Sequence, residues 1–313
     1  MAVCASRTAA LAAECLAETS WVDGTGSWFV AANWSNGVPT AGIGAQIYNG
    51  GTAQVNSSGA VACDLTLGFT ATQSGTVSVN SGTLTVLQEA EIGANGKGTL
   101  IVTNAGSASV GFLTIAALPG ASSAGTVSVN ASSLTCTTPQ GIWVGGDPGG
   151  PGGIGLLSVT NGGIVSAGNG PSGVIYVFGS GTLSGNGTVH TTTSGMTIDG
   201  TLKPSAGTLS VDGNSSVTLH SGAAMLSNVT PSSQDTVHIS NSGGVFLNGR
   251  LAVTMTGTFT PGTTYTLLTA DSGRHNTFFS SVSITFPPGQ GFTPQISYDT
   301  SHVYLVLVPN TGP

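Results

Sequence analysis

The sequence contains very little charge. Lys, Arg, Asp and Glu make up only 5% of its 313 residues, far below the roughly 25% that is usual in soluble domains. The surface must therefore be covered mainly by Ser, Thr, Asn and Gly. This composition suits stacked β-structure, in which small residues fill turns and outer faces, and it suits long helices poorly.

Basic residues are the scarcest charged type. The chain has five of them against twelve acidic residues, and its formal net charge is -7. They are Arg7, Lys97, Lys203, Arg250 and Arg274, which are scattered along the chain. Because nucleic-acid binding needs a clustered basic surface, nucleic acid is excluded as a partner.

Long apolar runs are absent as well. No stretch reaches the roughly 18 apolar residues of a membrane-spanning helix, so no transmembrane segment is expected. The first twenty residues are rich in alanine but lack the positive region of a secretion signal. Residues 8–18 are predicted to form a short helix with Leu11 and Cys15 on one face, which would cap the first strands of the fold.

The four cysteines show no metal-ligand spacing. If residues 6–18 are helical, Cys4 and Cys15 are too far apart to form a disulfide. Cys63 and Cys136 meet only if stacked neighbours bring them together, so free, buried thiols are expected. The histidines are well separated and form no metal-binding motif, so no metal is expected. The Gly-x-Gly patterns are not followed by a helix, so no nucleotide cofactor is expected either.

The most informative pattern is a repeat. GTVSVN occurs at 75–80 and again at 125–130, with related segments GTLIVTN at 98–104 and GLLSVTN at 155–161. The first glycines of the four copies are 23, 27 and 30 residues apart, a period typical of solenoid coils. Apolar and hydroxyl residues alternate within each copy, which places one row inside and one outside. Gly and Asn at the segment ends allow the positive φ angles of sharp corners.

These features predict an all-β protein built as a parallel β-solenoid. We expect a helical cap or arm at 1–20, a repeat solenoid at 21–180, and a continuation of the same rod at 181–313, where the short period loosens. The segment GDPGGPGG at 146–153 is expected to be a loop that leaves one coil. A pair of β-sandwiches is the alternative, because it also has short strands and glycine-rich turns, but it does not predict an identical repeat.

Several segments resemble a known class of repeat protein. The units around 75, 98 and 125 resemble the autotransporter-associated repeats of passenger domains and exosortase-sorted proteins, and SWVDGTGSWFVAANWSNGVPT at 20–40 resembles the segment that precedes the first coil. GTFTPGTTYTLLTADSGRHNTFFSS at 257–281 is similar to the terminal passenger segment. The resemblance implies a right-handed parallel β-helix that is extracellular or attached to the bacterial cell surface.

Two clusters are candidate interaction sites. Trp21, Trp28 and Trp34 allow two interpretations, a platform that stacks on sugars or a plug for the first coil, and the plug is favoured. The C-terminal stretch is apolar on both faces and needs cover from the rod or from another copy. It consists of Val303, Tyr304, Leu305, Val306, Leu307 and Val308.

The expected function is noncatalytic. We expect a secreted structural or adhesive solenoid that associates with itself, in filaments, through the N-terminal helix or the C-terminal strand. The alternative is a β-helix that binds cell-surface glycans or degrades polysaccharide. The best carboxylate pair for such chemistry, Glu89 and Glu91, lies on one strand face and is expected to be a solvated polar patch.

Overall fold

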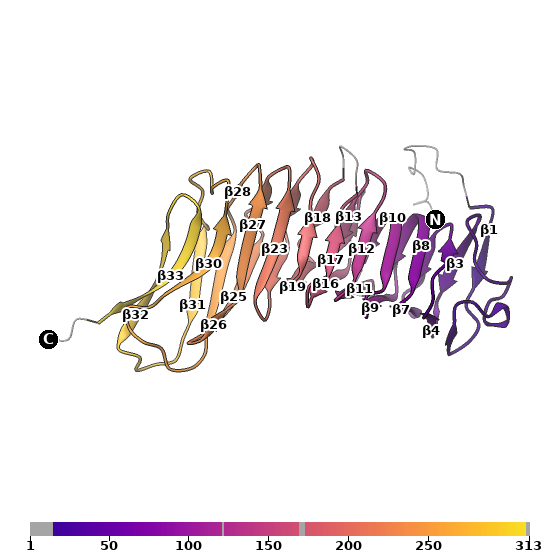
Figure 1. Ribbon diagram of the computed structural model, residues 1–313, viewed down its shortest axis with the longest axis horizontal. Coiled ribbons are helices and arrows are strands. Elements are labelled where there is room, and N and C mark those ends of the chain that lie inside the picture. The colour runs from indigo at the N-terminus through magenta and orange to yellow at the C-terminus, as the bar shows by residue number, and fades with distance from the viewer. Residues whose placement is uncertain (1–14, 121, 169–172, 311–313) are drawn as a thin grey trace.

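The computed structural model describes residues 15–120, 122–168 and 173–310. Strands account for 57% and helices for 1% of the structure, and the strands stack into a parallel β-solenoid of about nine turns. Figure 1 shows an elongated rod whose strands lie across its long axis, with β1 at one end and β32 and β33 at the other. The predicted β-solenoid is confirmed.

The rod has three faces, and a complete turn contributes one strand to each. Face 1 contains β2 (Thr25–Ser27), β4 (Asn49–Val55), β7 (Ser74–Asn80), β9 (Lys97–Thr103), β11 (Ala124–Asn130), β16 (Ile154–Thr160), β19 (Gly181–Gly185), β22 (Thr201–Pro204), β25 (Ala224–Thr230), β29 (Arg250–Met255) and β31 (Ser281–Thr285). β26 (Ser233–Gln234) pairs with the end of β25 in an antiparallel hairpin.

The other two faces are joined because two strands run through the corner between them. Face 2 contains β5 (Ala60–Ala62), the first halves of β8 (Thr83–Ile92) and β10 (Ser107–Ile115), β12 (Ser133–Cys136), β17 (Ile164–Ser166), β20 (Thr188–His190), β23 (Thr208–Gly213), β27 (Thr236–Asn241) and β30 (Thr264–Ala270). Face 3 contains β1 (Ala17–Ser20), β3 (Ile43–Ile47), β6 (Leu65–Leu67), the second halves of β8 and β10, β13 (Ile142–Val144), β18 (Ile175–Val177), β21 (Met196–Ile198), β24 (Val217–Leu219) and β28 (Val245–Phe246).

The four related repeat segments lie on successive turns of face 1 in the predicted register. β9 lies between β7 and β11, so the two copies of GTVSVN are two turns apart. The first glycines of the units pair in one row, which comprises Gly75, Gly98, Gly125, Gly155 and Gly181. The fifty-residue spacing of the identical copies is therefore the length of two turns.

Glycine is required in this row because the backbone at the end of a face 3 strand passes very close to it, as at Gly75 and Gly125. A β-carbon at Gly75 would lie 1.9 Å from the carbonyl oxygen of Ile47, and one at Gly125 would lie 2.1 Å from the carbonyl oxygen of Ile92. Both carbonyls belong to the ends of face 3 strands, where the chain turns toward face 1. A side chain at these positions would force the corner apart, so the motif must begin with glycine.

The core is a set of apolar rows that run along the rod. On face 1 the residue two places after each glycine points inward, and each of these side chains is completely buried. In order along the rod they are Val77, Leu100, Val127, Leu157 and Leu183. Burial of one such side chain contributes roughly 1.5–3 kcal/mol, so most of the stability comes from these rows.

The sharp corners after the face 1 strands use the expected residue types. Ser81 adopts a positive φ angle of 58° in the corner after β7, and Asn104 and Asn161 adopt 54° and 52° in the corners after β9 and β16. The Asn104 side-chain amide donates a hydrogen bond of 2.7 Å to the side chain of Asn80 one turn before it. The corners are therefore tied together along the rod as well as turned by their backbone angles.

The expected N-terminal helix is wrong where the structure describes it. β1 occupies Ala17–Ser20 and pairs in parallel with β3, so the helix does not reach residue 18. Residues 15 and 16 are not helical either, and the rest of that prediction, residues 8–14 with Leu11, lies outside the described residues. Alanine-rich composition favours a helix locally, but the pairing of this segment with the next turn outweighs that preference.

The stack continues without interruption past residue 180. β16 pairs with β19, and β18 pairs with β21, so the change in composition falls within one rod. The segment 146–153 leaves the coil as a hairpin of β14 (Gly146–Asp147) and β15 (Gly150–Pro151). Within the described part of the chain, no helix has the length and apolar character needed to cross a membrane.

The direction of pairing changes at the C-terminal end. β33 (His302–Pro309) pairs antiparallel with β30 on one side and with β32 (Phe292–Tyr298) on the other. The last turns on face 2 are therefore followed by an antiparallel hairpin that ends the parallel stack.

Candidate functional site

The three tryptophans close the N-terminal end of the core. Trp21 and Trp28 each pack edge-on against Trp34, with ring centroids 4.9 Å apart in both pairs. Their exposed fractions are between 0% and 3%, and the Trp34 indole nitrogen donates a hydrogen bond of 2.8 Å to the carbonyl of Trp28. They have the geometry of a plug, whereas a sugar platform requires an exposed ring face that these residues lack.

The outer edges of the first strands are also closed. The short helix η1 (Ala31–Asn33) and the loop after it are hydrogen-bonded to β2 and β1. The side-chain amide of Asn33 donates to the carbonyl of Ser27 at 2.9 Å, and that of Asn36 donates to the carbonyl of Glu18 at 3.0 Å. These contacts occupy backbone groups that an open strand edge would offer to another strand.

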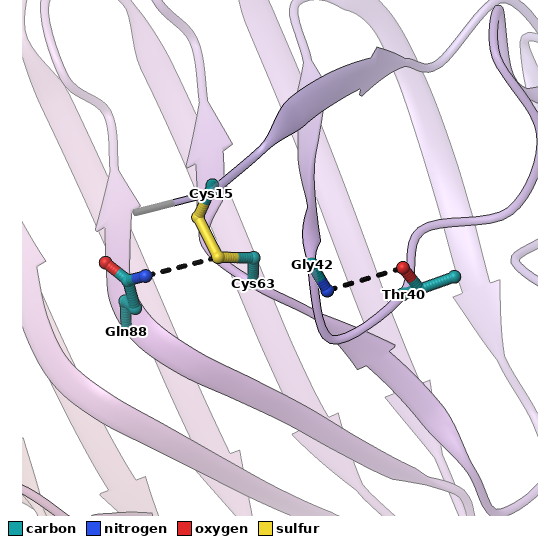
Figure 2. Close-up of a disulfide and its surroundings, with 5 residues drawn as sticks. All are labelled: Cys15, Thr40, Gly42, Cys63 and Gln88. Carbon is teal, nitrogen blue, oxygen red and sulfur yellow. Dashed lines mark hydrogen bonds between the residues drawn. A yellow bond between two sulfur atoms is a disulfide. The ribbon is translucent and has the colours of Figure 1, made fainter. Parts of the chain in front are cut away.

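A disulfide between Cys15 and Cys63 fastens the start of β1 to the second turn. Figure 2 shows the Cys63 sulfur between Cys15 and the side chain of Gln88, whose amide nitrogen lies 3.2 Å from it. The expectation of free thiols is therefore wrong for this pair, because it placed Cys15 in a helix. Cys136 is free and buried as expected, and burial raises the pKa of its thiol. Cys4 lies outside the described residues.

Two carboxyl groups converge near this disulfide. A β-carbon at Gly44 would lie 1.9 Å from an oxygen of Asp64 and 2.3 Å from an oxygen of Glu18, so both side chains lie over this glycine. Burial and the negative charge of Asp64 raise the pKa of Glu18 to about 7. Glycine at position 44 leaves the space that the two carboxyl groups fill.

The C-terminal apolar strand is covered by the rod itself on one face. Val303, Leu305 and Leu307 are completely buried, and β33 is hydrogen-bonded along both edges. Tyr304 and Val306 point outward and are half-buried. Of the two sources of cover that the sequence leaves open, the rod accounts for the inner face.

Face 1 ends in an open strand. β31 pairs with β29 and with no other strand among the described residues. Val282 is 43% exposed and Ile284 is half-buried, although their partners in β29, Leu251 and Val253, lie in the core. The inward apolar row therefore continues to the last strand and is left partly uncovered there.

An aromatic and polar cluster lies on the outside of face 3. Trp143 and Tyr176 stack with ring centroids 5.7 Å apart, and Phe178 packs 4.4 Å from Tyr176. The Tyr176 hydroxyl donates to Asp199, which raises the tyrosine pKa to about 12, and Asp199 also lies 2.6 Å from a ring nitrogen of His220. Sequence reasoning missed this cluster because its members come from separate turns, although Trp143 stands at an outward position of its segment.

Other polar groups on the outer faces act between turns. Glu89, from the candidate carboxylate pair with Glu91, accepts a hydrogen bond of 2.9 Å from Thr114 on the next turn. Three histidines pair with aspartates of a neighbouring turn: His190 with Asp212, His220 with Asp199, and His238 with Asp271. His302 pairs with Asp299 three residues away, at the turn between β32 and β33. In the part of the chain that the structure describes, no three such side chains are grouped as metal ligands.

These features define a parallel β-solenoid with a plugged, disulfide-fastened N-terminal end, an open edge at the C-terminal end and an aromatic cluster on one face. No family model matches the sequence, and no curated protein matches it significantly. Function must therefore be argued from the geometry of the chain itself.

Proposed function

We propose that the protein is a noncatalytic structural or adhesive rod that works outside the cell, in a surface layer or extracellular matrix. The observation that carries this proposal is the disulfide between Cys15 and Cys63. Disulfides form and persist in oxidising environments such as the periplasm, the cell surface and the extracellular space, and they are rare in the cytosol.

The build of the rod supports a mechanical role. Pairing between successive turns runs from β2 to β31 on face 1, so the core and the hydrogen-bond ladder both extend along the molecule. Ser and Thr alternate with the buried residues on the outside, and only 5% of the chain is charged. Such surfaces allow rods to pack side by side with little charge repulsion.

The location is tested by trapping thiols in the native host. Cells are lysed directly into denaturant with excess N-ethylmaleimide, so that every free thiol is blocked, including the buried Cys136, and the protein is then reduced and labelled with a maleimide polymer. We expect two sites to be protected from the first reagent in the wild type, and neither of them to be protected in the Cys15→Ser variant. Alkylation of Cys15 and Cys63 before reduction would overturn the proposal. External protease on intact cells, with lysed cells as the control, then distinguishes surface from periplasm.

Glycan binding is a second candidate function, and the cluster of Trp143, Tyr176, Asp199 and His220 favours it. Aromatic rings suit the apolar faces of sugar rings, and carboxylate and imidazole groups can bond sugar hydroxyls. A glycan array with the wild type and Trp143→Ala tests this. Phe246→Ala is the matched control, because Phe246 is an outward aromatic of the same face. Binding that Trp143→Ala leaves unchanged rules out this site.

A further inference from the structure

The two ends of the rod differ in a way that bears on self-association. At the N-terminal end, the tryptophan plug fills the core, and Asn33 and Asn36 bond the outer strands. At the C-terminal end, β31 has one edge without a strand partner among the described residues, and its inward row is partly uncovered. A head-to-tail filament would need an accepting edge at both ends, and within the described ranges between residues 15 and 310 the open edge of β31 is at the C-terminal end.

We propose that β31 pairs with β31 of a second copy of this chain, antiparallel and about a two-fold axis, to give a tail-to-tail dimer. The proposal goes beyond the proposed function, and it replaces the open filament expected from the sequence with a closed pair. A two-fold contact uses the same surface on both copies, so one open edge on each chain is sufficient and the contact closes on itself.

The side-chain pattern of β31 is self-complementary in this arrangement. If the axis passes beside Ser283, then Val282 of one copy lies opposite Ile284 of the other, and Ser281 lies opposite Thr285. Residues directly opposite in an antiparallel pair point to the same face of the sheet. The partly uncovered apolar rows of both copies therefore meet on the inner face, and the hydroxyl residues remain on the outer face.

The charge distribution favours a second copy as the occupant of this edge. Residues 276–298 contain no Lys, Arg, Asp or Glu, whereas the chain as a whole carries a net charge of -7. Natural edge strands usually carry charges or prolines that prevent pairing. β32 has Pro294, but β31 has neither. Two copies therefore approach with least repulsion at the end where the open edge lies.

The first test is the mass of the full chain in solution, measured by light scattering across a dilution series. We expect the wild type to have twice the chain mass and the Val282→Lys variant to have the mass of one chain. The matched control is Val22→Lys at the opposite end, where Val22 is 56% exposed, and this variant should remain dimeric. A monomeric wild type, or a dimer that Val22→Lys disrupts, overturns the proposal. Unfolding curves of both variants separate loss of pairing from loss of fold.

The second test is oxidative cross-linking in a Cys4→Ser background. Opposite residues in an antiparallel pair have β-carbons roughly 4.5–5.5 Å apart. In the Ser283→Cys variant, the new cysteine is therefore close enough to form a disulfide with the same residue of the second copy. Ser78→Cys, at an outward position in the middle of face 1, should not cross-link. A dimer without a Ser283→Cys cross-link contradicts the predicted pairing.

The thiol-trapping experiment is independent of both dimer tests. A monomeric chain whose Cys15 and Cys63 are protected would therefore overturn the dimer and leave the proposed location outside the cytosol intact.

Discussion

Loss of the disulfide between Cys15 and Cys63 should destabilise the protein by an amount that follows from the loop it closes. The two cysteines are 48 residues apart in sequence. The loop-entropy relation for a cross-link of this length gives about 4 kcal/mol at 25 °C. A typical domain has a total unfolding free energy of about 5–15 kcal/mol, so this loss should be easy to measure.

The assay is urea unfolding of the wild type, Cys15→Ser, Cys63→Ser and the double variant, under oxidising and reducing conditions. We expect each single variant to lose about 4 kcal/mol and the double variant to lose no more than a single one, because either change removes the same bond. Reductant should lower the stability of the wild type to that of the variants and leave the variants unchanged. Equal wild-type stability with and without reductant would refute the reasoning.

The pairing itself is checked by peptide mapping without reduction. Trypsin does not separate the two cysteines, because no Lys or Arg lies between them. Cleavage after glutamate and before aspartate isolates residues 15–18 and 23–63. We expect these two peptides to be joined, and a linkage of Cys63 to Cys4 would contradict the structure.

Three further predictions concern the rod. Leu100→Ala removes a completely buried side chain and should cost about 2–5 kcal/mol of unfolding free energy, whereas Ile101→Ala, which points outward, should cost much less. Gly125→Ala places a β-carbon 2.1 Å from a backbone oxygen and should cost about 1–3 kcal/mol in the same urea assay. The folded-state pKa of Glu18 is about 7 against an ordinary 4.5, so its stabilisation is complete below pH 4.5 and is lost as the pH rises to 7. The wild type should therefore have a lower urea midpoint at pH 8 than at pH 5. Glu18→Gln should make this difference smaller, and a difference equal to that of the wild type would contradict the prediction.

The architecture was predictable because its signals are local. The glycines of the repeated units mark the corner, and the alternation after them assigns each residue to the inner or outer side. Matching Gly75 with Gly98 and Gly125 gave the register found between β7, β9 and β11. Of the two interpretations of the tryptophans, the sequence favoured the plug, and all three side chains lie in the core.

The features that sequence reasoning missed depend on neighbours in other turns. Cys15 pairs with a residue 48 positions away, and an alanine-rich stretch gives no sign of that contact. The apolar residues on both faces of β33 show that the strand needs cover but not the direction of its partners, so the antiparallel end was not foreseen. The cluster of Trp143, Tyr176 and Asp199 spans several turns of unequal length, which hides the adjacency in the sequence.

The in-register stacking of turns is the claim on which the whole account depends, and paired cysteines test it most directly. Thr99 lies beside Thr126 in the pairing of β9 with β11, and Ser128 is two residues further along. Under mild oxidation in a Cys4→Ser background, Thr99→Cys with Thr126→Cys should form a disulfide within the chain, while Thr99→Cys with Ser128→Cys should remain reduced. Closure of the second pair, with the first remaining open, would contradict the register and the fold built on it.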